Sequence, residues 1–455
     1  MNTEKPLSPT PQEEFFSYAI PATVSMLLSA LVVIVDGFFI GHTAGPSGLA
    51  AINMTLPIFT LLLGLTIMVG VGSSIEVSHN LGAKNRPEAA RRFSGGMLLL
   101  IIVTALFCLP LFTSLDSILS FLKAKGDLHS LARQYLGMMR WFYPLMMANI
   151  GLSIFLRAAG KPGEAMGLGI LGNLLNVGLN ALFILGFEWG LQGAALASGL
   201  SALPPALLAM SRFLSKKIPL GFSKPRFFRG EIRGVLANGS SEMVGQVSVA
   251  ITTWLFNRIV LQRLGVNGLA AYTVVGYLIC FEGMAITGLA TGLGPIVGFH
   301  AGAGNGSRIR KVLSIALKSA GIVGIVCWLL VVFFGASIAF SMSGGDRQVF
   351  EIAKSTFALF TSAFLVNGIN VIAATFLTAL RKPGPSAIIA ILRGLVLNSF
   401  CVLTLPLFLG DLGIWLSFPI TEFSVLLISI PLMLHTHQSL PTKPSNASMK
   451  KSLTA

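Results

Sequence analysis

The chain has 455 residues, of which 54% are hydrophobic and only 11% are charged, and its net charge is +15. A water-soluble fold cannot bury so much apolar surface, so the composition excludes a soluble globular protein and indicates that lipid surrounds most of the chain. The apolar runs are long and continuous, unlike the short alternating strands of a membrane barrel. The sequence therefore predicts an all-α integral membrane protein.

The apolar residues form twelve stretches, each near the ~20 residues that a helix needs to cross the hydrocarbon. The first six cover 15–40, 48–77, 93–115, 133–156, 165–187 and 191–211, and the second six cover 234–261, 268–299, 312–340, 353–379, 386–408 and 412–434. We predict five regions: a cytoplasmic tail at 1–14, an N-lobe at 15–212, a cytoplasmic linker at 213–233, a C-lobe at 234–435 and a cytoplasmic tail at 436–455.

The two sets of stretches repeat each other about 220 residues apart. The residues GLAA at 48–51 return at 268–271, and LRAAGKPG at 156–163 returns as LTALRKPG at 377–384. Six spans bring the chain back to its starting side, so two six-helix bundles would be parallel copies with a pseudo-two-fold axis along the membrane normal. Such pairs of repeats bind substrate in a central cleft between them.

Lysine and arginine are concentrated on one side of the predicted membrane. Both the loop after the second stretch and the segment 212–233 are basic, whereas the opposite side carries Lys123, Lys125, Arg133, Arg258, Arg263, Arg347 and Lys354. The positive-inside rule then makes both termini cytoplasmic. The basic segment could instead bind nucleic acid or anionic lipid, but topology explains it, and we expect no nucleic-acid partner. Glu13 and Glu14 are unlike the basic start of a cleaved signal peptide, so the first stretch should remain as an anchor.

Motifs for enzyme chemistry are missing from the sequence. The chain has no GxxxxGK[ST] phosphate loop, no HExxH and no GxSxG. Its four cysteines stand singly in apolar runs, which predicts buried small side chains and no metal site. We therefore predict no enzyme and no cofactor, and a transporter without ATP hydrolysis must use an ion gradient.

Asp36 is the most informative single residue, because it follows the apolar run LVVIV at 31–35. An ionised carboxylate at a helix centre costs at least ~2.5 kcal/mol, so it needs a partner, a cavity or a proton. Pro21 in the same stretch removes a backbone hydrogen bond and is a candidate hinge. The alternative is that Asp36 lies at the outer interface and only anchors its helix.

Polar residues in the neighbouring stretches are candidate partners of this acid. Asn176 and Asn180 are spaced i, i+4 and share a helix face. Tyr135 and Ser198 add polar groups from the fourth and sixth stretches, and Asn173 lies on the fifth. For the asparagines, hydrogen bonding that only stabilises helix packing is the alternative to an ion site.

Two acids of the second half are candidates for binding a cationic substrate. Glu282 lies among apolar neighbours inside the eighth stretch, whereas Glu242 lies near the start of the seventh, where an interfacial position is the preferred interpretation. Methionines such as Met146 suit a cleft that accepts varied apolar molecules, although packing explains most of them equally well. Glu422 and Arg393 are weaker candidates.

Several motifs together resemble the MATE (multidrug and toxic compound extrusion) family. They are VDGFFIGH at 35–42, GLAAINMTLPI at 48–58, LGAKN at 81–85, LRAAGKPG at 156–163, GNLLNVGLNALFI at 172–184 and GAALAS at 193–198. The resemblance covers essentially the whole chain and leans toward the bacterial DinF-like or MepA-like branches. It implies twelve helices in two lobes, an inner-membrane location, and antiport of H⁺ or Na⁺ against organic, often cationic, compounds.

By this resemblance Asp36 corresponds to the acid of the N-lobe cation site, with Tyr135, Asn176 and Ser198 around it. Asn180 replaces a second carboxylate that many relatives have, which weakens a sodium site and favours proton coupling. Asn370 occupies a position that is acidic in the NorM-like branch, so we expect that branch's C-lobe cation site not to be used, and Asn370 remains a candidate for substrate binding.

We therefore predict a proton-coupled exporter of amphiphilic compounds, acting as a monomer in contact with membrane lipids. A flippase for a lipid-linked oligosaccharide is the alternative, and it should line its cleft with several basic residues. Within the spans only a few cations, among them Arg140 and Arg393, occur. A membrane-embedded enzyme or receptor would need a catalytic cluster or a soluble domain, and the sequence has neither.

Overall fold

The computed structural model describes residues 9–122, 126–215, 218, 220–225, 229–342 and 347–441, which are helical with short turns and contain no strand. Ten helices in this part of the chain are long and apolar enough to cross a membrane, and a bent pair of helices makes an eleventh if it forms one span. The protein is therefore an all-α multi-pass membrane protein, as the sequence predicts.

The helices of the first half are α1 (Pro11–Gly82), α2 (Arg86–Thr113), α3 (Leu115–Phe121), α4 (Asp127–Ala158), α5 (Pro162–Asn180), the π-helix η1 (Ala181–Gly186), α6 (Gly190–Ser201) and α7 (Leu203–Leu214). Those of the second half are α8 (Arg229–Gly302), α9 (Gly306–Met342), α10 (Arg347–Thr361), α11 (Phe364–Ala379), α12 (Pro383–Ile391), the π-helix η2 (Leu392–Val396), α13 (Leu397–Leu409) and α14 (Asp411–Gln438).

Helices α1 and α8 each contain two apolar spans. In α1 the spans are Pro11–Val32 and Ala51–Gly82, and in α8 they are Gly230–Gly265 and Asn267–Gly302. The break in α8 lies at Gly265, whose φ of 66° is readily adopted only by a residue without a side chain.

Helix α1 begins four residues before the first predicted stretch, because Thr10 and Glu13 form a capping box. Thr10 Oγ1 accepts from the backbone N–H of Glu13 at 3.2 Å, and Glu13 Oε2 accepts from the N–H of Thr10 at 2.7 Å.

Two predicted spans differ from simple apolar helices. The stretch 133–156 lies in α4, whose 32 residues are long enough to cross a membrane. This helix contains Arg133, Arg140 and Arg157 and is not among the ten apolar helices. The stretch 353–379 is divided between α10 and α11, which are bent by 43° relative to each other.

The chain divides into two compact units. The C-unit comprises Met1–Val24, Ser78–Asn85 and Leu255–Ala455, and the N-unit comprises Ser25–Val77 and Arg86–Trp254. Three of the boundaries thus fall inside α1 and α8 and one in the turn between α1 and α2, whereas the predicted division at 213–233 stays a prediction.

The first span of each half is divided between the two units, and within each unit α1 and α8 pack closely together. In the C-unit a Cβ on Gly292 of α8 would lie 2.7 Å from the backbone of Ala19 in α1. In the N-unit a Cβ on Gly72 of α1 would lie 2.2 Å from the carbonyl oxygen of Val235 in α8. Glycine at these positions lets the two backbones approach each other.

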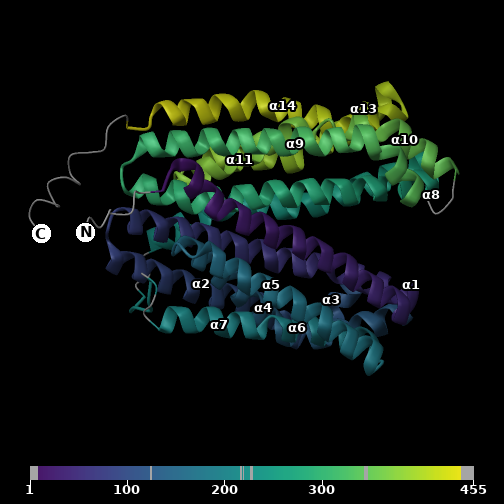
Figure 1. Ribbon diagram of the computed structural model, residues 1–455. Helices are drawn as coiled ribbons and strands as arrows, with labels where there is room; N and C mark the ends of the chain where they lie inside the picture. The colour runs from purple at the N-terminus through teal and green to yellow at the C-terminus, as the bar shows by residue number, and fades with distance from the viewer. Residues whose placement is uncertain are drawn as a thin grey trace, which may run out of the picture. The chain divides into compact units, whose positions relative to one another are not determined.

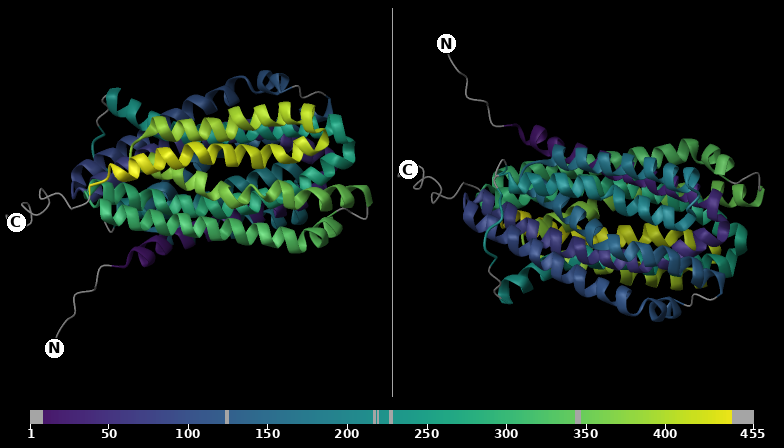
Figure 2. Two further views of the ribbon diagram at one scale, coloured as in Figure 1. Left: turned by 90° about the horizontal axis from the view of Figure 1, so that it is seen from above. Right: turned by 90° about the horizontal axis from the view of Figure 1, so that it is seen from below.

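Each unit has its own apolar core. In the N-unit the core includes Met139, Tyr143 and Met147 of α4, packed against α1 and α6. In the C-unit, where α11 packs against both α9 and α14 (Figures 1 and 2), Phe360 lies at the centre of a group of rings and contacts Trp415 at a centroid distance of 6.0 Å. These cores hold the polar residues of the spanning helices in fixed positions.

Candidate functional site

The N-unit contains a chain of hydrogen bonds that begins at Asp36. Asn180 Nδ2 donates to Asp36 Oδ1 at 2.5 Å and to Asn176 Oδ1 at 3.1 Å. Asn176 Nδ2 in turn donates to Ser198 Oγ at 3.3 Å. The structure thus brings together four of the five residues predicted for cation coupling, from α1, α5 and α6. We call this group the Asp36 cluster.

The end of α5 provides the two asparagines at the centre of the Asp36 cluster. Asn176 and Asn180 lie one turn apart on α5 and are 7% and 1% exposed, while Asp36 is half-buried. Directly after Asn180 the α-helix changes into the π-helix η1. Single π-helical turns inside α-helices are frequent at functional sites, because the extra residue re-aims the side chains beside it.

The other residues predicted for the first half lie around or apart from this cluster. Tyr135 of α4 is partly buried against the N-unit core and within electrostatic range of Asp36, and Met146 of the same helix packs on that core. Asn173 belongs to a separate contact, in which its Nδ2 donates to Ser29 Oγ at 3.2 Å. Helix α1 is helical on both sides of Pro21, whose role as a hinge stays a prediction.

The C-unit contains a second and more highly charged chain of contacts. Asn367 Nδ2 donates to Glu282 Oε2 at 2.7 Å, and Asn367 Oδ1 accepts from Arg393 Nη2. Arg393 Nε donates to Glu422 Oε1 at 2.7 Å. Both glutamates are only 1% exposed, although they lie in helices of a membrane protein. We call this group the Glu282 cluster.

Asn370 extends the Glu282 cluster by one further step. Its Nδ2 donates to Glu422 Oε2 at 2.8 Å and to the Glu422 carbonyl oxygen at 2.9 Å, and its Oδ1 accepts from Ser429 Oγ at 2.6 Å. Asn370 is therefore held inside the C-unit by α14, and a role in substrate binding stays a prediction for it.

The centre of the Glu282 cluster is formed by Arg393, Glu422 and Asn367. The sequence marks the first two only as weaker candidates and does not single out Asn367. The signal was present, because Arg393 and Glu422 are isolated opposite charges in neighbouring apolar stretches and Asn367 and Asn370 share a helix face. Glu242 lies outside both clusters, half-buried on α8 in the N-unit.

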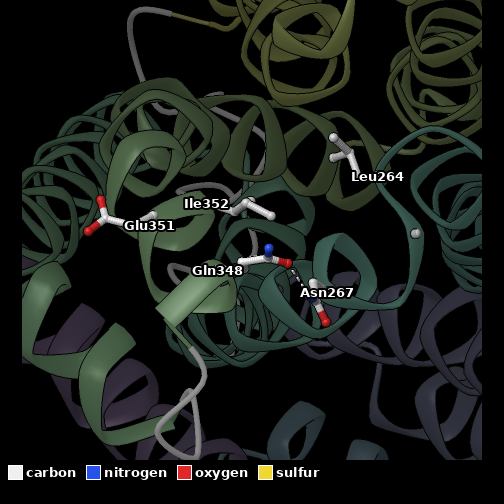
Figure 3. Close-up of a pocket in the computed structure, with 6 residues that line it drawn as sticks. Leu264, Asn267, Gln348, Glu351 and Ile352 are labelled. Atoms are coloured by element: carbon white, nitrogen blue, oxygen red, sulfur yellow. Dashed lines mark hydrogen bonds between the residues drawn. The ribbon is translucent and has the colours of Figure 1, made fainter.

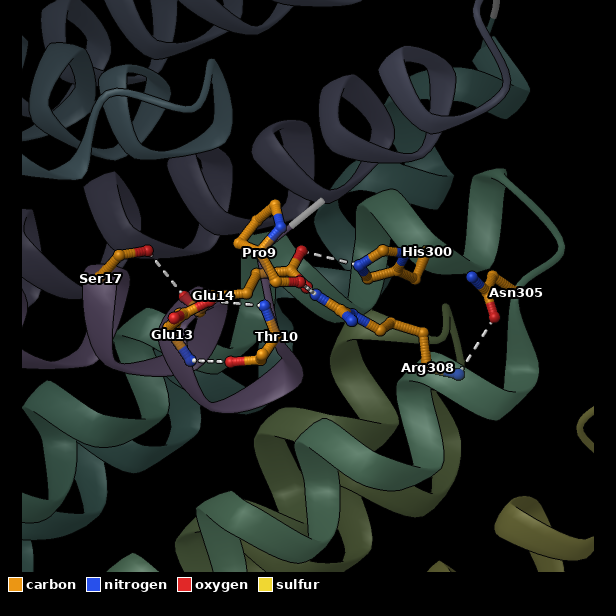
Figure 4. Close-up of polar contacts among 8 residues, drawn as sticks. All are labelled: Pro9, Thr10, Glu13, Glu14, Ser17, His300, Asn305 and Arg308. Atoms are coloured by element: carbon orange, nitrogen blue, oxygen red, sulfur yellow. Dashed lines mark hydrogen bonds and ion pairs between the residues drawn. The ribbon is translucent and has the colours of Figure 1, made fainter. Parts of the chain in front are cut away.

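Charged side chains also meet at one end of the C-unit (Figure 4). Glu14 Oε1 lies 2.7 Å from His300 Nε2, and Glu14 Oε2 accepts from Arg308 Nε at 2.7 Å. This trio joins the start of α1 to the end of α8 and the start of α9. His300 thus belongs to a polar network with Glu14, which also binds Arg308.

The described residues of the two clusters form no metal centre, and the best-formed cavity is lined by other residues. Over the described residues, no group of three or more His, Cys, Asp or Glu could hold a metal ion. A surface cavity of about 470 Å³ lies in the C-unit beside the break at Gly265, where Asn267 Nδ2 donates to Gln348 Oε1 at 2.6 Å (Figure 3). None of the predicted site residues lines it.

Comparisons with known proteins agree with the fold and with both repeats. The family model described as MatE matches residues 21–182 and 243–403. The Multidrug export protein MepA of Staphylococcus aureus is 28% identical over 389 residues, which is 84% of each chain. A protein of the same name from Staphylococcus saprophyticus is 26% identical over 387 residues, again 84% of each chain.

Solved structures show the same fold at low sequence identity. A crystal structure of MATE in complex with MaL6 has a TM-score of 0.90 at 20% identity, covering 95% of this chain and 97% of that chain. The outward-facing conformation of a multidrug resistance MATE family transporter of the MOP superfamily has a TM-score of 0.90 at 21% identity, with the same coverage.

Proposed function

The chain belongs to the MatE family, and from this premise we propose that it is a secondary active multidrug efflux antiporter. It exports amphiphilic, often cationic, organic compounds in exchange for protons by alternating access. The observation that carries the proposal is the Asp36 cluster, in which a half-buried acid of α1 begins a chain of hydrogen bonds made otherwise of amide and hydroxyl groups.

Neutral partners leave the charge of Asp36 uncompensated. A carboxylate in apolar surroundings is stabilised by a counter-ion or by uptake of a proton. Uptake of a proton removes the charge from the hydrogen bond between Asn180 and Asp36, and bonds to neutral acceptors have about half the strength of bonds to charged ones. Protonation would thus loosen the link between α1 and α5 beside η1.

Protons are a better fit than sodium at this cluster. Sodium is a hard cation that oxygen ligands hold best when more than one is negatively charged. The cluster has one acid, because Asn180 stands where a second could be. Each charge that moves through 100 mV yields about 2.3 kcal/mol, so an ordinary proton gradient is sufficient to drive export.

The flippase alternative is less well supported. It needs free cations for phosphate groups, whereas Arg393 is paired with Glu422. Arg140 lies over the ring of Phe112 at 5.3 Å and donates to the carbonyl oxygen of Leu111. Arg140 and Arg393 thus both already have partners within their own units.

An inner-membrane location with both termini on the cytoplasmic side completes the proposal, as does a monomeric state with lipid around the helices. The two ends of the described chain support this topology. Arg308 donates to the carbonyl oxygen of Pro9, and Arg310 donates to those of Leu440 and Pro441 at 3.0 Å. Both ends therefore contact the first turns of α9, on the same side of the C-unit.

Transport into proteoliposomes tests the proposal. A pH gradient should drive movement of a cationic dye such as ethidium in the wild type, and Asp36→Asn should abolish this movement. Asp116→Asn is the matched control, because Asp116 is exposed and pairs with Arg133 on the surface of the N-unit. A sodium gradient acting alone, or an Asp36→Asn variant with wild-type transport, would overturn the proposed mechanism.

A further inference from the structure

One carboxylate oxygen of Glu282 is buried, and the function proposed above does not involve it. Glu282 is 1% exposed, and its Oε2 accepts from Asn367. Its Oε1 has no hydrogen-bond partner among the described residues. A buried carboxylate that accepts a single hydrogen bond is strongly disfavoured in its ionised form.

The charges around Glu282 do not compensate it. Arg393 makes its ion pair with Glu422 at 2.7 Å, and it reaches Glu282 only through the amide of Asn367. One arginine faces two glutamates, so the ionised cluster would have a net charge of −1. The cluster becomes neutral when one carboxyl group is protonated, and Glu282 is the one without a cation in contact.

We propose that Glu282 is a second proton-binding site, which holds a proton in the resting protein and exchanges it during the transport cycle. The site lies in the C-unit and is separate from Asp36 in the N-unit. The titratable and charged groups that face it are Arg393 of η2, Glu422 of α14 and Cys327 of α9.

The orientation of Asn367 distinguishes a proton from a metal cation at this site. A guanidinium group can only donate hydrogen bonds, so the atom of Asn367 that faces Arg393 must be its oxygen. The NH₂ group of Asn367 therefore faces Glu282. A sodium ion at Glu282 would meet this donor where it needs an oxygen ligand, whereas a protonated carboxyl still accepts from it.

Infrared spectroscopy of the purified protein tests the protonation without any transport. Glu282→Gln should lose one protonated-carboxyl band present in the wild type. Asp116→Asn is the control, since Asp116 is exposed and paired with Arg133 outside the cluster, and it should keep the band. A band that persists in Glu282→Gln, or is lost in Asp116→Asn instead, would overturn the assignment.

Thermal unfolding checks that the variants are folded and adds a second readout. Glutamine has the shape of a protonated glutamate, so Glu282→Gln should keep the Tm of the wild type. Glu422→Gln removes the partner of Arg393 and should lower the Tm. The reverse order of the two effects would contradict the proposal.

Proton counting tests the exchange step, which rests on the proposed function. In weakly buffered detergent solution, binding of ethidium should release two protons from the wild type and one from either Asp36→Asn or Glu282→Gln. A release unchanged in Glu282→Gln would show that its proton is not exchanged. If neither the wild type nor the variants release protons, the proposed proton coupling fails. The infrared result still decides whether Glu282 is protonated.

Discussion

The Asp36 cluster and the Glu282 cluster are two ways of holding an acid among the helices of a membrane protein. The first has one acid and only neutral partners, so no ion pair fixes its charge state, and a proton can bind and leave. The second has two acids and an arginine, so one acid is fixed by an ion pair and the other is left over. We therefore expect a buried acid to stabilise the structure when a cation pairs with it and to bind a proton when none does.

The largest effect should come from removing the cation of the second cluster. Arg393→Gln leaves Glu422, which is 1% exposed, without its ion-pair partner. Breaking a buried pair costs 3–5 kcal/mol, and since Arg393 is 31% exposed we expect a loss near the lower limit, about 3 kcal/mol. The measurement is thermal or denaturant unfolding of the purified protein.

Arg140→Gln provides the control for this experiment. Arg140 is also an arginine of a spanning segment, but its partners are a carbonyl oxygen and aromatic rings. Its replacement should cost about 1 kcal/mol. The double variant Arg393→Gln with Glu422→Gln should regain most of the lost stability. Equal losses for the two arginines would mean that Arg393 is not a structural counter-ion.

The class of the fold could be predicted from the sequence because it depends on local composition. Apolar length and the repeated motifs sufficed for an all-helical membrane protein. The i, i+4 spacing of Asn176 and Asn180 predicts a shared face, and the two side chains bond to each other, with Asn180 also bonded to Asp36. The centre of the Glu282 cluster was harder, because it joins α8, α11, η2 and α14, and contacts between helices far apart in sequence leave no local pattern.

The helical details that were missed also have physical reasons. The division between α10 and α11 has no Pro or Gly at Ser362 or Ala363 to signal it. The three arginines of α4 make that helix less apolar than a free-standing span, but they have partners that composition does not reveal. Arg133, for example, donates to Asp116 Oδ1 at 2.8 Å.

A second acid in the first cluster should make it resemble a sodium site. In Asn180→Asp two carboxyl groups would lie about 2.5 Å apart, at the distance now spanned by the hydrogen bond. Like charges this close cannot both stay ionised without a cation, so the pair takes up a proton or a metal ion. We expect sodium to bind at least about tenfold more tightly than to the wild type, which corresponds to about 1.4 kcal/mol.

Sodium binding can be followed by the rise in Tm with sodium concentration, with transport driven by a sodium gradient as a second measurement. Asn173→Asp is the control, because Asn173 lies on the same helix but contacts Ser29. A sodium response in Asn173→Asp as large as in Asn180→Asp would show that any added acid on α5 is sufficient, and the cluster would lose its special role.

The trio of Glu14, His300 and Arg308 shows how an ion network behaves nearer to water. Its side chains are 12–19% exposed, compared with 1% for Glu422. Solvent weakens the pairing but also lowers the penalty for breaking it, so Glu14→Gln should cost about 1 kcal/mol. The loss should shrink at high salt, which unfolding at two ionic strengths would detect. A loss as large as that of Arg393→Gln would contradict this interpretation.

The smallest effect on stability is expected at the residue with the largest effect on transport. Asp36→Asn keeps an oxygen that accepts from Asn180 and adds no unpaired charge, so the free energy of unfolding should change by less than about 1 kcal/mol. Unfolding measured beside transport separates the two properties in one variant. If Asp36→Asn lost as much stability as Arg393→Gln, its inactivity would reflect misfolding and not a missing proton site. A stable but inactive Asp36→Asn, next to an unstable Arg393→Gln, would establish that the two clusters divide coupling and structure between them.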